Sequence, residues 1–296
     1  MLQPSMWTSY LIEWFPEEMV KCFAEHGWHT LELSDEHGHD LLKLGDPATV
    51  GAKFRRFAAD RGVSFPQGHF YLCNKGFRPE DLAGRRVADV APADDADFAT
   101  AMDDMKRWVD LFSALGVKAG VLHIGGGKLG AAGWSQERIF ARRVDAVTRI
   151  AEFAKGGPVK ICIENMCDEA SGVRTAADII RYIDAVGADK AGICLDTGHA
   201  NITPVDSAEF VSGAGAHLKA LHIADNLGKS DDHMLPYSRG TVKWTPVMRA
   251  LRAVKYDGLF NFEVPGDNRC PKPVRLAKLD YALKLANWMI ENDGVE

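Results

Sequence analysis

The sequence lacks the segments that would carry a protein into or across a membrane. No apolar run approaches the length that a helix needs to span a bilayer. The first residues, MLQPSMWTSYLIEWFPEE, contain no basic leader and reach Glu13 early, which is not the pattern of a signal peptide. These absences favour a cytoplasmic protein that does not bind membranes.

Cysteine pairs and excess positive charge are missing as well. The six cysteines, at positions 22, 73, 162, 167, 194 and 270, form no C-x-x-C pair. Cys162 and Cys194 fall in strand-like runs, where we expect buried free thiols. The formal net charge is -6, and no segment is dense in lysine, arginine and aromatic residues. Both facts argue against a nucleic acid partner held through its phosphates.

The 296 residues instead show a regular alternation of short β-rich runs and longer helical patterns. Runs such as VKICIEN and AGICLD are almost continuously apolar, as expected of parallel strands that are buried on both faces. The predicted strands are Gln3–Thr8, Thr30–Ser34, Ser64–Phe70, Ala119–Ile124, Val159–Glu164, Ala191–Asp196, His217–Ile223 and Leu259–Val264.

Helical patterns lie between these strands. From Phe98 to Phe112 an apolar side chain recurs at three–four spacing, and Gly116 is expected to end that helix. Thr175 and Asp178 resemble a capping box at the start of another helix. Eight strand–helix units without a linker predict a single (β/α)₈ barrel domain over residues 1–296. A doubly wound open sheet is the main alternative.

One long irregular stretch, at about 72–97, follows the third predicted strand. In a barrel it would lie on the catalytic rim, and loops of this length often act as lids. Phe77 and Arg78 are the residues of most interest in this stretch. A solvated acidic loop is the alternative for its second half.

Polar residues stand where the apolar strands end. Glu164 closes VKICIEN, Asp196 closes AGICLD, His222 lies near the end of HLKALHIAD, and Glu263 closes LFNFEV. An acidic side chain at the end of a buried strand is costly unless it is paired or binds a cation. In a barrel these strand ends converge on one face. Three carboxylates and an imidazole in one small volume therefore predict a divalent metal site.

The segments GICLDTGHANI, ALHIADNLGKSDDH, GTVKW and FNFEVPG resemble the sugar-phosphate isomerase/epimerase family of xylose isomerase-like TIM barrels. This superfamily, also called AP endonuclease family 2, contains endonuclease IV, ketose 3-epimerases and inosose dehydratases. The resemblance is strong from about the fourth strand onward. The motifs D-T-G-H, H-x-x-D-N and D-x-H, in this order, are specific for the superfamily but not for one reaction.

The resemblance implies roles for individual residues. Glu164, Asp196, His222 and Glu263 fall on the four metal ligands, and the two glutamates also fall on the proton-transfer carboxylates of the epimerases. His199 falls on a histidine that contacts a substrate oxygen. Four further residues match the multi-metal cluster of the endonuclease and are shared by many sugar enzymes: His69, His123, Asp231 and His233. We assign these to substrate binding, with core histidines as the alternative for His69 and His123.

The stretch after His222, NLGKSDDHMLPYSRG, departs from the ketose 3-epimerases. It lacks the arginine that these enzymes usually carry a few residues after the histidine, and Tyr237-Ser-Arg-Gly replaces their P-G-x-G turn. An isomerase, a dehydratase or a lyase that uses the same enediolate therefore stays open.

Other candidate contacts lie on the predicted rim. Gly125 to Lys128 could hold a phosphate through backbone N–H groups, but a flexible turn is the better interpretation. The remaining candidates are Arg239, Arg269 and Lys272 for an anion, and Trp14, with Trp7, Phe15, Phe70 and Trp244, for the apolar face of a sugar.

We therefore predict an isomerase or epimerase that moves a proton next to the carbonyl of a small sugar or sugar phosphate. Its cofactor would be one divalent metal, manganese, zinc, cobalt or magnesium, without an organic cofactor. A homo-oligomer is compatible with the sequence. The alternatives are a dehydratase or lyase acting by β-elimination and an endonuclease IV-like hydrolase of abasic DNA.

Overall fold

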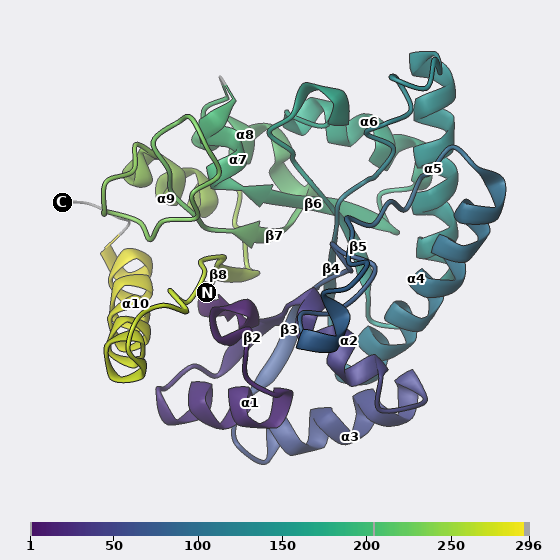
Figure 1. The fold of residues 1–296 in the computed structure, drawn as a ribbon. Helices are drawn as coiled ribbons and strands as arrows, with labels where there is room; N and C mark the ends of the chain where they lie inside the picture. Colours follow the sequence, from purple (N-terminus) through teal and green to yellow (C-terminus); the bar gives the residue numbers. More distant parts are fainter. Residues whose placement is uncertain (1, 204, 293–296) are drawn as a thin grey trace.

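The computed structural model describes residues 2–203 and 205–292. Eight parallel strands lie at the centre, hydrogen-bonded in the order β7-β6-β5-β4-β3-β2-β1-β8, and helices surround them (Figure 1). The predicted (β/α)₈ barrel is therefore confirmed, and each strand falls within the run predicted for it. The strands are β1 Gln3–Trp7, β2 Thr30–Leu33, β3 Ser64–His69, β4 Ala119–Leu122, β5 Lys160–Glu164, β6 Ala191–Asp196, β7 Leu218–His222 and β8 Leu259–Phe262.

The outer ring consists of helices that cover the strands from outside (Figure 1). The α-helices are α1 Pro16–Glu25, α2 Asp35–Leu42, α3 Pro47–Ala59, α4 Asp95–Leu115, α5 Gln136–Phe153, α6 Ala176–Val186, α7 Thr197–Ile202, α8 Ser207–Ala214, α9 Trp244–Ala253 and α10 Lys272–Asn292. The short 3₁₀ helices are η1 Thr8–Leu11, η2 Pro79–Asp81, η3 Glu169–Ser171 and η4 Gly215–His217. In the described residues, no helix combines the length and the apolar character of a membrane span.

The barrel closes between β7 and β8. Ile223, just after β7, forms a parallel bridge with Phe262 of β8. Its N–H donates to Asn261 O at 2.8 Å, and its carbonyl accepts from Glu263 N at 3.2 Å. On its other side β8 pairs with β1 from Gln3 to Met6. These bonds exclude the open doubly wound sheet.

Two local predictions are confirmed and one boundary is corrected. Gly116 ends α4 with a left-handed φ of 85°, and Thr175 with Asp178 forms the capping box of α6. The irregular loop ends at Asp94 rather than at 97, because the Asp94 carboxylate accepts backbone N–H bonds and starts α4 there. The predicted boundary missed this cap because several aspartates follow one another in the sequence.

Small buried side chains fill part of the barrel below the strand ends. The thiols of Cys162 and Cys194 are fully buried and free, as predicted, and burial raises the pKa of Cys162 to about 12. These two thiols are therefore apolar packing groups rather than nucleophiles. Their cluster consists of Ala119, Val121, Cys162, Cys194 and Ala220.

The β3–α4 loop, residues 70–94, is fixed to helix α2, beside which it runs (Figure 1). Asp40 of α2 accepts from Arg78 Nε at 2.9 Å, and the Arg78 guanidinium also donates to the carbonyl oxygens of Glu13 and Trp14. We call the α2 side chains that contact the loop the α2 anchor. They are Asp35, Glu36, His39 and Asp40, with Lys43 at the C-cap.

Candidate metal centre and active site

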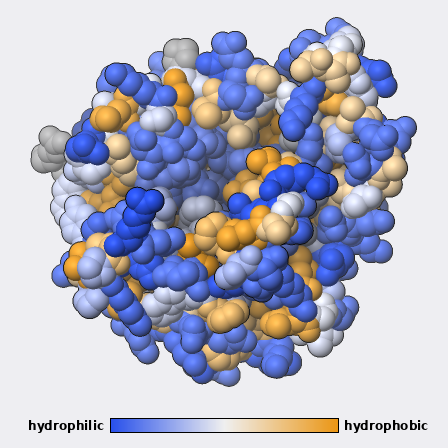
Figure 2. Space-filling model, viewed as in Figure 1, coloured by the Kyte–Doolittle hydropathy of each residue, from blue (hydrophilic) through white to orange (hydrophobic). Residues whose placement is uncertain are grey.

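Four polar residues stand at the carboxyl ends of the last four strands. They are Glu164 of β5, Asp196 of β6, His222 of β7 and Glu263, which directly follows β8. One ligand atom from each lies within 4.8 Å of the others, and all four residues are buried. The convergence predicted from the strand ends is therefore present in the structure. The face that carries it is hollowed near its centre (Figure 2).

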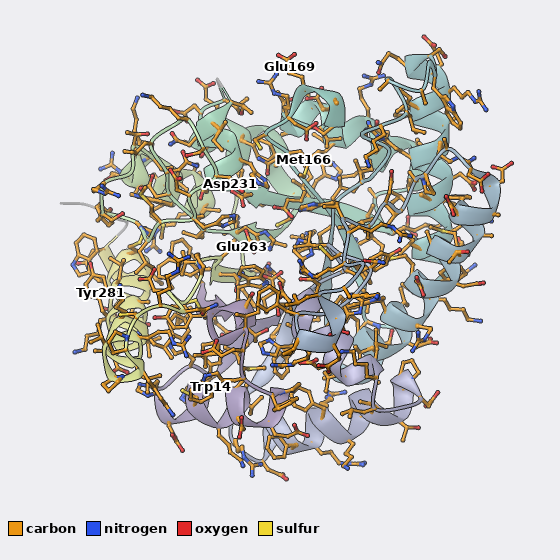
Figure 3. The ribbon with its side chains drawn as sticks, viewed as in Figure 1. Trp14, Met166, Glu169, Asp231, Glu263 and Tyr281 are labelled. Carbon is orange, nitrogen blue, oxygen red and sulfur yellow. The ribbon has the colours of Figure 1, made fainter. Side chains whose placement is uncertain are left out.

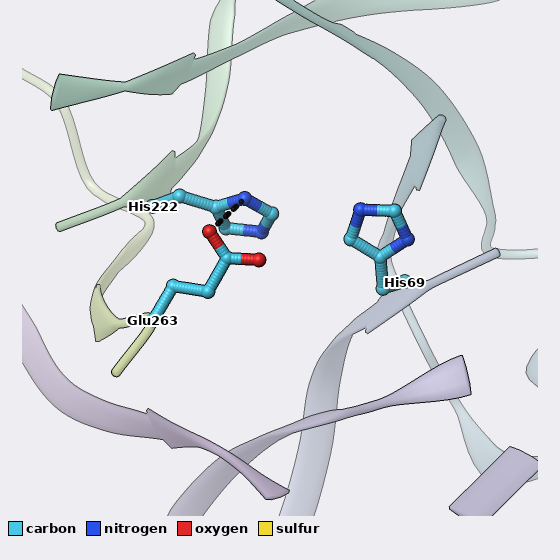
Figure 4. Close-up of side chains that lie close together, drawn as sticks. All are labelled: His69, His222 and Glu263. Carbon is cyan, nitrogen blue, oxygen red and sulfur yellow. Dashed lines mark ion pairs between the residues drawn. The ribbon is translucent and has the colours of Figure 1, made fainter. Parts of the chain in front are cut away.

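His222 is surrounded by carboxylates. Its Nδ1 lies 3.1 Å from Glu164 Oε1 and 3.2 Å from Glu263 Oε2. Figure 4 shows the contact with Glu263, with the ring of His69 on the opposite side. The His69 and His222 rings stack with their centroids 5.5 Å apart. The strand ends thus bring acidic and imidazole groups to one point from both halves of the barrel.

The electrostatics follow from this crowding. Burial alone would raise the pKa of Glu164, but His222 and His123 hold that pKa well below its usual range. Burial likewise opposes ionisation of Glu263, yet His222 and His233 lower its pKa to about 2. For His222, burial is outweighed by the neighbouring acidic groups, which raise its pKa well above the ordinary value. Both glutamates are therefore ionised at neutral pH and can accept a proton.

Asp196 provides the test of whether a cation fits. Its Oδ1 caps α7 by accepting the N–H of His199 at 2.8 Å. Its Oδ2 is buried and has no hydrogen-bond partner among the residues that the structure describes, and burial raises the pKa of this carboxyl to about 7. A buried carboxylate oxygen without a donor is costly. A divalent ion at the four-residue group would satisfy it, and carboxylates with imidazole are suitable ligands.

A second group of potential ligands shares Glu164. Its Oε2 lies 3.3 Å from His69 Nε2 and 3.1 Å from His123 Nε2, and one ligand atom from each of these three residues lies within 4.8 Å of the others. The His69 side chain is 1% exposed, whereas that of His123 is 35% exposed. Both histidines therefore face the cluster, and His123 also reaches solvent.

A third set is joined by Asp231. Its Oδ2 lies 3.2 Å from His199 Nε2 and 3.0 Å from His233 Nε2. The other ring nitrogen of each histidine faces a backbone carbonyl, that of Asn165 or of Glu263. Asp231 and Glu263 lie close together near the centre of the molecule (Figure 3). The predicted acidic and histidine site residues thus all lie at the same end of the barrel.

Three buried polar residues of this region were not predicted. Glu32 of β2 contacts His222 Nε2 at 2.9 Å, and Asn261 of β8 donates to the same glutamate. Asn165 accepts the N–H of Asp196 at 2.7 Å. The signal for Glu32 was present, since an acid in the middle of the apolar strand TLEL needs a partner.

Two predicted substrate contacts, Trp14 and Arg239, are not joined to the cluster by any bond in the described residues. Trp14 is over α1, away from Glu263 (Figure 3), and Lys272 stands over its ring at 4.4 Å. Arg239 is exposed. Their roles in substrate binding therefore stay predictions. At the glycine-rich turn, Asp89 occupies the N–H of Gly126, which favours the turn over a phosphate site.

Comparison with known proteins agrees with this geometry. The sequence model of the xylose isomerase-like TIM barrel family matches residues 20–291. The chain belongs to this family. The resemblance found in the sequence motifs is therefore confirmed.

Relatives within the xylose isomerase-like barrels include sugar epimerases and an endonuclease. The chain is 28% identical over 243 residues to L-ribulose 3-epimerase of Mesorhizobium japonicum, which covers 79% of this chain and 74% of the relative. It is 24% identical to a probable endonuclease 4 of Mesomycoplasma hyopneumoniae, over 77% of this chain and 81% of the relative. A crystal structure of D-psicose 3-epimerase with D-tagatose from Clostridium cellulolyticum superposes with a TM-score of 0.78 at 16% identity, covering 98% of this chain and 99% of the other.

Proposed function

We propose that this protein is a divalent-metal-dependent isomerase or epimerase of small sugars. The observation that carries the proposal is the buried group of Glu164, Asp196, His222 and Glu263, with their ligand atoms within 4.8 Å. The relation to L-ribulose and D-psicose 3-epimerases supports a ketose as the substrate class. The metal would be manganese, zinc, cobalt or magnesium, and no organic cofactor is needed for this chemistry.

The four residues would hold the cation, which when bound supplies a Lewis acid for a substrate carbonyl. One of Glu164 and Glu263 accepts the proton from the carbon beside that carbonyl. The other returns a proton to the opposite face or to the neighbouring atom of the enediolate. Asp196 and His222 act as ligands without proton transfer, and His199 holds a substrate oxygen.

The proposal is tested by isotope exchange with two glutamine variants. With L-ribulose or D-psicose in D₂O, the wild type should place deuterium on the carbon beside the carbonyl. Glu164→Gln and Glu263→Gln keep an oxygen donor but lose the base, so we expect each to reduce exchange by about 10²- to 10⁴-fold. Mass spectrometry of the sugar and elemental analysis of each variant are the measurements. Glu209→Gln, an exposed change at the start of α8, is the matched control.

Undiminished turnover in both variants, with metal still bound, would contradict the acid–base assignment. That result would favour the alternative of a hydrolase. In a hydrolase the second group, His69, His123 and Glu164, could hold a further metal ion. Loss of a hydroxyl from the sugar, detected as a dehydrated product in the same spectra, would instead identify β-elimination at the same site.

A further inference from the structure

Glu32 lies in the middle of β2 and is fully buried. Its Oε1 is 2.9 Å from His222 Nε2, and its Oε2 accepts a hydrogen bond from the side-chain amide of Asn261. The strands that carry these partners, β7 and β8, are far from β2 in the sequence. A carboxylate at this depth is costly unless its partners compensate its charge.

The two nitrogens of His222 face different neighbours. Nδ1 points to Glu164 and Glu263, the carboxylates of the four-residue group. Nε2 points to Glu32. A neutral imidazole carries one N–H and one lone pair, whereas an ionised carboxylate can only accept. A carboxylate at Nε2 therefore keeps the proton there and leaves the lone pair on Nδ1.

We propose that Glu32 is a positioning residue that fixes the tautomer and the ring orientation of His222, so that Nδ1 is the nitrogen that binds the metal. This inference rests on the metal centre of the proposed function but not on its reaction. A carboxylate behind a ligating histidine also raises the basicity of the ring. Asn261 holds the second oxygen of Glu32, which fixes the direction of the carboxylate.

If Glu32 only stabilised the fold, replacing it would lower stability without changing the metal affinity. Gln67, the neighbour of Glu32 in the β2–β3 register, shows what such a role looks like. It is 1% exposed, and its side-chain amide donates to the backbone carbonyl of Leu221 at 3.2 Å rather than to the imidazole. Gln67→Met therefore removes a buried polar group from the same layer and leaves the ring of His222 in place.

The test measures Zn²⁺ binding and the state of the ring, without any substrate. Metal-free wild type, Glu32→Gln and Gln67→Met are titrated with Zn²⁺ against a fluorescent chelator. In Glu32→Gln the amide can donate to Nε2 and move the proton to Nδ1, so we expect the dissociation constant to rise by about 10- to 100-fold. Gln67→Met should lower the unfolding temperature and leave the Zn²⁺ affinity unchanged.

Long-range ¹H–¹⁵N spectra of the Zn²⁺-loaded proteins give a second readout. In the wild type we expect Zn²⁺ on Nδ1 of His222 and a slowly exchanging proton on Nε2, and in Glu32→Gln that proton should exchange faster. Unchanged Zn²⁺ affinity in Glu32→Gln would overturn the inference. The wild-type spectrum decides even if the variant fails to fold, because Zn²⁺ on Nε2 contradicts the inference. A protein that behaves as expected here but epimerises no sugar would overturn only the proposed reaction.

Discussion

At the residue scale, the Asp231 carboxylate lies between two imidazoles. Burial would raise the pKa of Asp231, but its hydrogen bonds with His199 and His233 lower that pKa. In return the pKa of His233 rises to about 10, because the bond with Asp231 and the charge of Glu263 outweigh burial. In the metal-free protein these groups therefore form an ionised network rather than neutral hydrogen bonds.

This network predicts how the stability of the metal-free protein depends on pH. The folded pKa of His233, about 10, lies above its unfolded value of about 6.5. Its stabilising contribution is therefore complete below about pH 6.5 and is lost as the pH rises through about 10. Urea unfolding from pH 6 to 10 should show a steeper loss of stability in the wild type than in His233→Gln. His29→Gln, at an exposed histidine, should follow the wild type, and parallel curves for all three proteins would refute the network.

A second residue-scale prediction concerns Asp196, whose Oδ2 has no hydrogen-bond donor in the described part of the chain. Asp196→Ala removes a ligand but neither of the two bases, so activity should fall mainly through loss of metal. We expect the affinity for the metal to fall by at least about 100-fold. This is more than the loss expected when a residue that only hydrogen-bonds to a ligand is changed. Added Mn²⁺ should restore part of the turnover. Glu263→Gln should not be rescued in this way, and equal rescue of both variants would contradict the division between ligand and base.

At the element scale, the α2 anchor determines where the β3–α4 loop lies. The Asp40 and Arg78 side chains are 8% and 10% exposed, whereas Arg85 is 24% exposed and 3.9 Å from Glu36. A buried ion pair loses much when one partner is removed, because the other charge stays behind unpaired. The Glu36 carboxylate is buried too, but its 3.9 Å contact with the partly exposed Arg85 is long and therefore weaker.

Arg78→Met should therefore destabilise the protein by about 3–5 kcal/mol. Arg85→Met should cost less, about 1 kcal/mol, because its contact with Glu36 is long and Arg85 is partly exposed. Limited proteolysis should cut Arg78→Met within residues 70–94 before other sites, since the loop loses its bonds to Asp40, Glu13 and Trp14. Urea unfolding gives the free energies. Similar losses in both variants, or unchanged cleavage, would show that the loop is held by other contacts.

The same scale shows what a sequence can predict. The eight strands could be placed because strands buried on both faces are continuous apolar runs, and Glu164, Asp196 and Glu263 stood out as the acids that end them. The α2 anchor could not be predicted, because its partners in the loop become neighbours only when the chain folds. The strand sequence signalled that Glu32 needs a partner, but it could not identify that partner, since His222 is 190 residues away. The roles of Trp14 and Arg239 stay predictions, because nearness to a strand end or to the rim does not determine where a loop side chain points.

At the scale of the whole molecule, the metal should stabilise the fold. A ligand at 100 times its dissociation constant adds about 2.7 kcal/mol to the stability of the folded state. For domains of about 150–250 residues each kcal/mol shifts the melting temperature by about 2–4 °C, and this chain of 296 residues is only slightly larger. Removing the metal with a chelator should therefore lower the melting temperature by roughly 5–10 °C. Calorimetry measures the shift, and elemental analysis should find one metal per chain. Three per chain would favour the hydrolytic alternative.

The closure between β7 and β8 has a consequence for the order in which the barrel assembles. The other strand pairs are joined by ladders, whereas this seam is joined around a single bridge at Ile223. His222 of β7 and Glu263 after β8 stand on its two sides, so one cation bound to both would cross-link the two edge strands of the sheet. The metal site can therefore form only after β7 and β8 have come together, and a bound metal then holds these two strands in place. In the metal-free protein, local opening should be most frequent between β7 and β8. Amide hydrogen exchange should therefore be faster in these two strands than in the other strands of the barrel.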